Sequence, residues 1–251
     1  MSTIDDHARW RQQRRAAVTA PTGNLALIET RWIGPVRADV SPRPLDGSLA
    51  RSTEPPAAWA QASVAVTELS RADISTGETE YGLRLWDAHS PAIQAFERID
   101  GYDFDPAWVI QATFTAVDGG FTVPFEYIRD NGSTRNKVIP GTITFTLNGT
   151  EHRLVAFDDD GTLLLVFGDA TNGTETYGAG RFLFVQRDAS AAQDARNETV
   201  VLDFNRAFVP PCGFSAQYNC PMPPPQNRFT EPIRAGEKNV IFRDGFSPYH
   251  T

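Results

Sequence analysis

Turn signals repeated at short intervals constrain the fold of this chain more than any other feature. They are Asp118-Gly-Gly120, Asp130-Asn-Gly132, Asn148-Gly149, Asp160-Gly161 and Asn172-Gly173. Asn-Gly and Asp-Gly supply the positive φ angles that tight hairpins need. Between and around them, strands are predicted over residues 63–69, 81–86, 109–117, 121–128, 137–147, 151–157, 162–167, 176–185 and 199–204. This spacing predicts a mainly β fold, an antiparallel sheet that is closed or nearly closed into a barrel.

The Asn148-Gly149 turn also predicts the register of its hairpin. A two-residue turn at this point pairs Leu147 with Thr150, Phe145 with His152, and Ile143 with Leu154. Residues that pair across two strands share a face of the sheet. Because Ile143 marks the inward face, we expect His152 to point into the protein.

The remaining segments are predicted to frame this sheet. Residues 5–20 are expected to form a helix with Asp5 as its N-cap, residues 25–33 a strand and residues 90–97 a second short helix. Residues 35–56 form a long proline-rich connection, which is a candidate functional loop. After Phe204 the chain is again rich in proline, which cannot donate to a ladder, so this segment should wrap the sheet. We predict one domain over residues 1–251: an N-terminal helix, strands and long loop (1–95), then the β core with its C-terminal wrap (96–251).

Charge and hydropathy restrict the partners. The chain has 31 acidic and 23 basic residues and a formal net charge of −8, so neither nucleic acid nor an anionic membrane is expected to bind. No apolar run approaches the roughly 18 residues of a membrane span. The N-terminus carries acids and arginines, unlike a secretory signal, so the cytoplasm is the expected compartment. The four arginines near the N-terminus are expected to form a solvated face or a protein contact: Arg9, Arg11, Arg14 and Arg15.

Several motifs in the last third of the chain resemble one family. They are Asp169-Ala-Thr-Asn-Gly-Thr-Glu-Thr-Tyr-Gly-Ala-Gly-Arg181, Asp203-Phe-Asn-Arg-Ala207, Cys212 with Cys220-Pro, Pro224-Pro-Gln-Asn-Arg228 and Ile233-Arg-Ala-Gly-Glu-Lys238. Together they resemble the domain of unknown function family 1684, which is bacterial and archaeal. The resemblance covers at least residues 105–238 and implies no established activity. The chain departs from the family pattern at Phe208 (usually Tyr), Val209 (usually Asn) and Gln226 (usually Glu), which puts any role of those positions in doubt.

Two of these motifs contain candidate site residues. Asp169 and Thr171 precede an Asn-Gly turn, where their side chains are expected to bond the turn backbone. Tyr177 and Arg181 lie four residues apart on a predicted strand and would share a face. The glycines between them leave the opposite face bare, so that a ligand or a second backbone can approach. Arg181 could hold an anionic group, or it could join a buried network with Asp203 or Glu237.

The same residues, with two others, make up a candidate catalytic set. Asp203 ends a predicted strand, where it could act in catalysis or cap the next turn. The set comprises Tyr177, Arg181, Asp203 and His152, facing the barrel interior. No nucleotide-binding, P-loop, zinc-protease or nucleophile-elbow motif is present, so no cofactor or metal is predicted. Cofactor-independent acid–base chemistry on a small molecule, such as hydrolysis or elimination, fits best.

Two other functions stay open, and whether the protein is an enzyme is uncertain. It could be a binding module for an apolar or acidic ligand, without turnover. It could instead be an interaction protein, with the N-terminal helix and the proline-rich wrap as contact surfaces and a homodimer as one form. Cys212 and Cys220 could be thiols, a disulfide or metal ligands, although their spacing exceeds that of usual structural zinc pairs.

Overall fold

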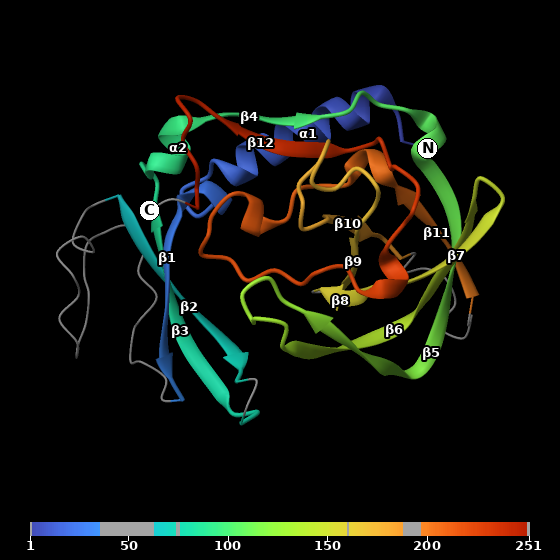
Figure 1. The fold of residues 1–251 in the computed structure, drawn as a ribbon, viewed down its shortest axis with the longest axis horizontal. Helices are drawn as coiled ribbons and strands as arrows, with labels where there is room; N and C mark the ends of the chain where they lie inside the picture. Colours follow the sequence, from blue (N-terminus) through green and yellow to red (C-terminus); the bar gives the residue numbers. More distant parts are fainter. Residues whose placement is uncertain (1, 36–62, 74–75, 160, 188–196, 250–251) are drawn as a thin grey trace. The chain divides into compact units, whose positions relative to one another are not determined.

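The computed structural model describes residues 2–35, 63–73, 76–159, 161–187 and 197–249 (Figure 1). The chain divides into two compact units. The first holds Met1–Arg11, Ile99–Pro210 and Asn219–Asn239, and the second holds Gln12–Arg98, Pro211–Tyr218 and Val240–Thr251. Residues 36–56 of the predicted long connection lie outside the described residues. The organisation as one domain stays a prediction.

Helix α1 (Ile4–Val18) is confirmed, with a different cap from the one predicted. The Thr3 hydroxyl accepts the Asp6 N–H at 3.2 Å, and the Asp6 carboxylate accepts the Thr3 N–H at 3.1 Å. This reciprocal pair is a capping box, which satisfies two N–H groups that a helix start leaves open. The prediction of Asp5 as N-cap is therefore wrong, because Thr3 already takes that position. Among the described residues, no helix is long and apolar enough to cross a membrane.

The second unit contains a three-stranded antiparallel sheet in the order β1-β3-β2. Its strands are β1 (Leu27–Gly34), β2 (Val64–Ala72) and β3 (Thr79–Asp87). Helix α2 (Pro91–Ala95) follows, and its N-cap Ser90 accepts the Ile93 N–H and donates to the Leu25 carbonyl at 2.6 Å. The predicted short helix is confirmed, but it ends earlier because β4 (Phe96–Gly101) begins at Phe96.

The first unit contains two larger sheets. One has the order β11-β5-β6-β7, formed by Asn197–Asp203, Val109–Glu126, Thr134–Leu147 and Thr150–Val155. The other has the order β10-β9-β8, formed by Arg181–Val185, Thr162–Phe167 and Phe157–Asp159. The pairing of β6 with β7 has the predicted register, with Phe145 opposite His152 and Ile143 opposite Leu154.

The main core of the first unit receives side chains from both of its sheets. Inward-facing residues of their strands supply it, such as Phe114 on β5, Ile143 on β6 and Leu165 on β9, each at most 1% exposed. Phe229 and Ile233 of the C-terminal segment complete the cluster. The proline-rich segment therefore contributes to the core, in addition to covering the sheets.

The predicted barrel is wrong. In the described part of the chain the strands form four separate sheets, including a two-stranded one of β4 and β12 (Glu237–Phe242), and none is closed (Figure 1). Local turn signals specify which neighbours pair, but closure depends on distant strand edges. Here the C-terminal segment bonds to one edge strand of each larger sheet: Phe208 exchanges two backbone hydrogen bonds with Phe182 on β10. The buried Asn227 amide bonds both main-chain groups of Val155 at the end of β7. At these two positions the edge groups bond to the C-terminal segment and not to another strand of a closed sheet.

Two other predictions need correction, and two strands are not predicted. Asp118-Gly-Gly120 is not a turn: it lies inside the continuous strand β5, where the register shifts between Ala116 and Phe121. Gly119 and Gly120 have φ angles of +72° and +68°, so the positive φ that the motif supplies serves an irregularity in the ladder. The strand predicted over residues 176–185 begins only at Arg181. Strands β4 and β12 are not predicted, because both are short and carry several charges.

Candidate functional site

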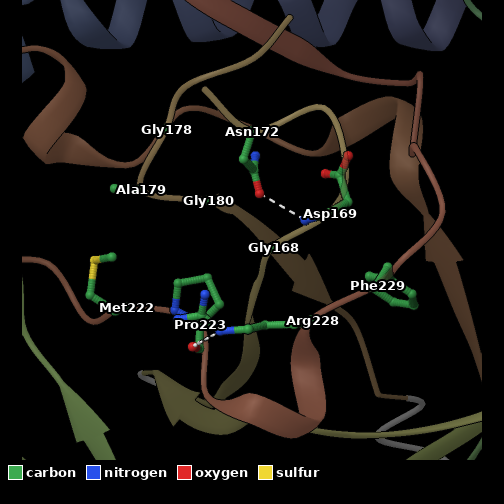
Figure 2. A pocket seen from close by; sticks show the side chains of 10 residues that line it. All are labelled: Gly168, Asp169, Asn172, Gly178, Ala179, Gly180, Met222, Pro223, Arg228 and Phe229. Atoms are coloured by element: carbon green, nitrogen blue, oxygen red, sulfur yellow. Dashed lines mark hydrogen bonds between the residues drawn. The ribbon is translucent and has the colours of Figure 1, made fainter. Parts of the chain in front are cut away.

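A pocket of about 220 Å³ lies in the first unit (Figure 2). Two segments far apart in the sequence form its walls. The first contributes Gly168, Asp169, Asn172, Gly178, Ala179 and Gly180, and the second contributes Met222, Pro223, Arg228 and Phe229. Both segments carry motifs of the family resemblance, so the densest sequence motifs and the pocket coincide.

The first wall is a turn held by its own side chains. Asp169 Oδ1 accepts the Thr171 N–H at 2.9 Å and the Thr171 hydroxyl at 2.6 Å. Asn172 Oδ1 accepts the Asp169 N–H at 2.7 Å, as Figure 2 shows. The Thr171 and Thr176 hydroxyls are 2.8 Å apart and bond to each other. The prediction that Asp169 bonds the turn backbone is confirmed, whereas the Thr171 hydroxyl bonds side chains.

Arg181 lies behind this wall and is fully buried at the start of β10. Its Nη2 donates to Asp169 Oδ2 at 2.8 Å and to the Ile233 carbonyl at 2.7 Å. Its Nη1 donates to the carbonyls of Ala235 and Glu237. The guanidinium thus connects the turn to the C-terminal segment by charge-assisted hydrogen bonds.

The alternative of a buried arginine–carboxylate network is confirmed, but with another partner. The carboxylate is that of Asp169, whereas Asp203 or Glu237 is predicted. Glu237 accepts from Arg181 through its main-chain carbonyl, and its carboxylate accepts the Val209 N–H at 2.8 Å. A catalytic role of Arg181 stays a prediction, and its full burial leaves no exposed donor for a ligand.

The glycines after Tyr177 are predicted to let either a ligand or a second backbone approach. In the structure a second chain segment approaches Gly180. A Cβ atom on Gly180 would lie 2.5 Å from Pro223 Cγ, and the φ angle of Gly180 is +88°. Tyr177 is half-buried, lies in the loop before β10, and donates its N–H to the Lys238 carbonyl. The prediction that Tyr177 and Arg181 share one strand face is wrong, because the strand begins at Arg181. Tyr177 is not among the residues that line the pocket.

Asp203 caps a turn, which confirms one of its two interpretations. It precedes the 3-10 turn Phe204–Arg206, where its carboxylate accepts the Asn205 N–H at 3.2 Å. Arg206 Nε lies 3.3 Å from the same carboxylate. The buried Asn205 amide also bonds both main-chain groups of Asp105. Asp203 therefore orders this turn, and it does not line the pocket.

His152 points inward, as the hairpin register predicts. Its ring stacks on Phe145 with centroids 5.3 Å apart, and the Phe229 ring lies 5.0 Å away. Its Nε2 is buried and has no hydrogen-bond partner in the described part of the chain. Phe229 lines the pocket and His152 does not. His152 therefore contacts the pocket lining through the Phe229 ring.

Other residues line the pocket that are not predicted from the sequence as site residues. Arg228 is exposed, and its Nε donates to the Pro223 carbonyl at 3.1 Å (Figure 2). Met222, Pro223 and Phe229 supply apolar surface. Of these residues, only Arg228 lies within the motif 224–228, which contributes to the family resemblance but has no periodicity that would orient a side chain.

A charged cluster extends from the first wall. Glu175 accepts from the Tyr102 hydroxyl at 2.8 Å and from Arg234 Nη2 at 2.7 Å. The Arg234 hydrogen bonds, followed by that of Tyr102, lower the pKa of Glu175 to about 2. Burial, followed by the hydrogen bond to Glu175, raises the pKa of Tyr102 to about 12. Both shifts favour the ionised carboxylate and the neutral phenol that this arrangement requires.

The two cysteines are buried free thiols, so the disulfide alternative is wrong. Within the described residues, no group of three or more histidine, cysteine, aspartate or glutamate side chains could hold a metal ion.

The fold and site define a mainly β protein with a small pocket between a polar turn and a proline-rich segment. The family model for the protein of unknown function DUF1684 matches residues 94–238, and the chain belongs to this family. The resemblance stated from the motifs is therefore confirmed.

The chain is similar to an uncharacterized protein of Haloarcula marismortui, solved by NMR in solution. The two are 29% identical, with a TM-score of 0.47, over 57% of this chain and 77% of the other. A search of curated proteins gives no match.

Proposed function

We propose that the protein binds a small molecule through an anionic group, in the pocket between residues 168–180 and 222–229. The position of Arg228 carries this proposal. Its Nε is held by the Pro223 carbonyl, which orients the guanidinium at the pocket. An arginine fixed in this way can present its remaining N–H donors to a carboxylate or phosphate in bidentate geometry.

The electrostatics of the lining support an anionic ligand. Asp169 and Arg228 are the charged residues that line the pocket. The Asp169 side chain is fully buried, and its carboxylate receives four donors, one of them from the Arg181 guanidinium. Its charge is thus compensated inside the protein, whereas that of Arg228 is exposed. The pocket should therefore attract anions.

The main chain adds two donors. Gly180 N–H donates to the Tyr177 carbonyl and closes a turn. The N–H groups of Gly178 and Ala179, inside this turn, donate to no acceptor in the part of the chain that the structure describes. Free N–H groups of consecutive residues are a common element of anion sites.

The size of the pocket supports a metabolite of few atoms. Its volume of about 220 Å³ lies below the roughly 300–1,000 Å³ of pockets for drug-sized ligands. Met222 and Phe229 offer apolar contact on either side of the polar groups. A short carbon chain that ends in a carboxylate or phosphate would match this lining.

Acid–base catalysis by Tyr177, Arg181, Asp203 and His152 stays a prediction, as do the cytoplasmic location and the homodimer. A small-molecule enzyme and a non-catalytic binding module would both bind the ligand, and only the enzyme would convert it. A homodimer that depends on residues 1–20 would support the interaction protein instead.

Calorimetric titration with inorganic phosphate, acetate and short-chain carboxylates tests the proposal. Arg228→Gln should weaken binding by about 10- to 100-fold, because a charge-assisted hydrogen bond is worth roughly 1.5–3 kcal/mol. Arg153→Gln is the matched control, since Arg153 is exposed on β7 and does not line the pocket. Loss of binding in both variants, unchanged affinity in Arg228→Gln, or no binding of any of these anions to the wild type would contradict the proposal.

A further inference from the structure

The chain contains three Asn-Gly pairs, and the structure holds them in two different ways. They are Asn131-Gly132, Asn148-Gly149 and Asn172-Gly173. An asparagine that precedes a glycine is open to deamidation, because the glycine nitrogen can attack the side-chain amide carbon and no Cβ on the glycine obstructs it. The reaction needs an asparagine side chain that is free to turn and a glycine N–H that is not bonded. These two conditions separate the three pairs.

Asn131-Gly132 and Asn148-Gly149 lie in turns of the same kind. The φ angle is +50° at both asparagines, and it is +85° and +80° at the glycines that follow them. Positive φ at both central residues is the mark of a type I′ turn. All four residues are exposed. In the part of the chain that the structure describes, neither asparagine side chain and neither glycine N–H makes a hydrogen bond.

Both of these turns have open space around the glycine. A Cβ atom on Gly149 would meet no atom within 4 Å. The nearest atom to a Cβ on Gly132 would be Glu126 Oε1, at 3.7 Å. The amide carbon and the glycine nitrogen can therefore approach each other at either turn without displacing a packed group.

The third pair, Asn172-Gly173, belongs to the first pocket wall, and both of its reacting groups are bonded. Asn172 Oδ1 accepts the Asp169 N–H at 2.7 Å. Its Nδ2 donates to the Thr176 hydroxyl at 2.9 Å and to the Tyr177 carbonyl at 3.2 Å. The Gly173 N–H donates to the Thr176 carbonyl at 2.9 Å. Deamidation of Asn172 therefore requires that these bonds open first.

We propose that Asn131 and Asn148 are sites of spontaneous deamidation in the folded protein, whereas the hydrogen bonds of the pocket turn protect Asn172. The glycine nitrogen gives its proton to a base in the solvent and attacks the asparagine Cγ. The Cγ–Nδ2 bond breaks, the amide nitrogen takes up a proton and leaves as ammonia, and a succinimide ring remains. Water then opens either carbonyl of the ring and gives aspartate or isoaspartate. No oxidant or reductant takes part.

The two kinds of site differ in what the reaction would change. At Asn148 it adds a negative charge, and isoaspartate also adds a backbone carbon to the turn that sets Leu147 opposite Thr150. At Asn172 it would place a second carboxylate beside Asp169 in the pocket lining. Protection of Asn172 thus keeps further negative charge out of the pocket. The inference rests on the hydrogen bonds alone and does not depend on the proposed function.

Ageing of the folded wild-type protein at mildly alkaline pH tests the inference. Peptide mapping by mass spectrometry measures the aspartate and isoaspartate that form at each asparagine over time. Asn131 and Asn148 should each react about 100-fold faster than Asn172, because three side-chain hydrogen bonds hold Asn172 and each is worth roughly fivefold in an equilibrium. In concentrated urea the three pairs should react at similar rates, which separates the effect of the fold from that of the sequence.

Two results would overturn the inference: equal rates at the three asparagines of the folded protein, or faster reaction of Asn172. Thr176→Val tests the protection itself, since it removes one acceptor of Asn172 Nδ2 with little change in shape. In a variant whose circular dichroism matches the wild type, the rate at Asn172 should rise about fivefold and that at Asn148 should not change. A folded variant with the wild-type rate at Asn172 would show that this hydrogen bond does not protect it.

Discussion

Arg181 and Asp169 form an ion pair in which neither side chain is exposed, with Nη2 2.8 Å from Oδ2. The pair connects the turn that forms one pocket wall to the C-terminal segment, through the Ile233 and Ala235 carbonyls. Asp169 Oδ1 also accepts the Ile233 N–H at 3.1 Å. One buried electrostatic contact therefore connects the first pocket wall to the chain just beyond the second wall.

Replacement of one partner should destabilise the protein strongly. Asp169→Asn leaves the Arg181 charge buried without a carboxylate, which costs about 3–5 kcal/mol of unfolding free energy. Denaturation in urea, followed by circular dichroism, measures this cost. Arg9→Ala is the control, because Arg9 is largely exposed in its pair with Asp6, and such pairs contribute about 0–1 kcal/mol.

The double variant Asp169→Asn/Arg181→Met separates the burial of a charge from the loss of the contact. Removal of both charges should recover much of the lost stability, since a buried pair can often be replaced by apolar groups. If the double variant is as unstable as the sum of the single variants, the two residues do not act as a pair.

Gly180 should tolerate no side chain. Its φ is +88°, and a Cβ would lie 2.5 Å from Pro223 Cγ and 2.6 Å from the Phe167 carbonyl oxygen. Gly180→Ala adds overpacking to backbone strain and should cost about 2–5 kcal/mol. Gly149→Ala is the matched control, because φ is +80° there and no atom lies within 4 Å of the added Cβ. Gly149→Ala should lower the unfolding free energy only by the backbone strain, about 1–2 kcal/mol. Equal losses of stability in the two variants would contradict the contact between Gly180 and Pro223.

Contacts between residues close in the sequence are predictable from it, whereas contacts between distant residues are not. The β6–β7 register follows from Asn148-Gly149 and strand alternation alone, and the inward direction of His152 followed from it. Asp118-Gly-Gly120 carries a similar signal, yet there the long ladder with β6 resumes beyond the glycines. A positive φ permits both a turn and a bulge, and the pairing of distant residues decides between them.

The candidate site was predicted only in part for the same reason. The turn at Asp169 and the bare glycines are local features, and the structure places both at the pocket. The second wall, with Arg228, comes from a proline-rich segment without the periodicity that reveals a buried face. The choice of Asp169 as partner of Arg181, in preference to Asp203, depends on how β10 meets the C-terminal segment, which no spacing encodes.

His7 should make stability depend on pH. It is 5% exposed, and its ring stacks on Trp10 and contacts Phe104. Burial, followed by the charge of Arg11, lowers its pKa below the ordinary 6.5, against the hydrogen bond to the Asn205 main chain. Because the folded pKa is depressed, the neutral form is the one that the fold favours. The stabilisation is present above 6.5 and is lost as the pH falls from 6.5 through the folded value.

Urea denaturation at pH 7.5 and 5.5 measures this loss. His7→Phe keeps an aromatic ring but cannot take up a proton, so its unfolding free energy should change less between the two pH values than that of the wild type. His89→Gln, at an exposed position, should behave like the wild type. If His7→Phe and the wild type show the same dependence, protonation of His7 is not coupled to unfolding.

Tyr102 and Glu175 should titrate as a linked pair, since the phenol donates to the carboxylate at 2.8 Å. The pKa of Tyr102 is raised to about 12, by burial first and then by Glu175. The pKa of Tyr127 is also raised to about 12, chiefly by burial, so it serves as an internal reference. In Glu175→Gln the negative charge is lost, and phenolate absorbance should show one of these two late tyrosines ionising at lower pH. It should still ionise above the ordinary 10.0, because burial remains. A titration curve that matches the wild type would mean that Glu175 does not hold the Tyr102 proton.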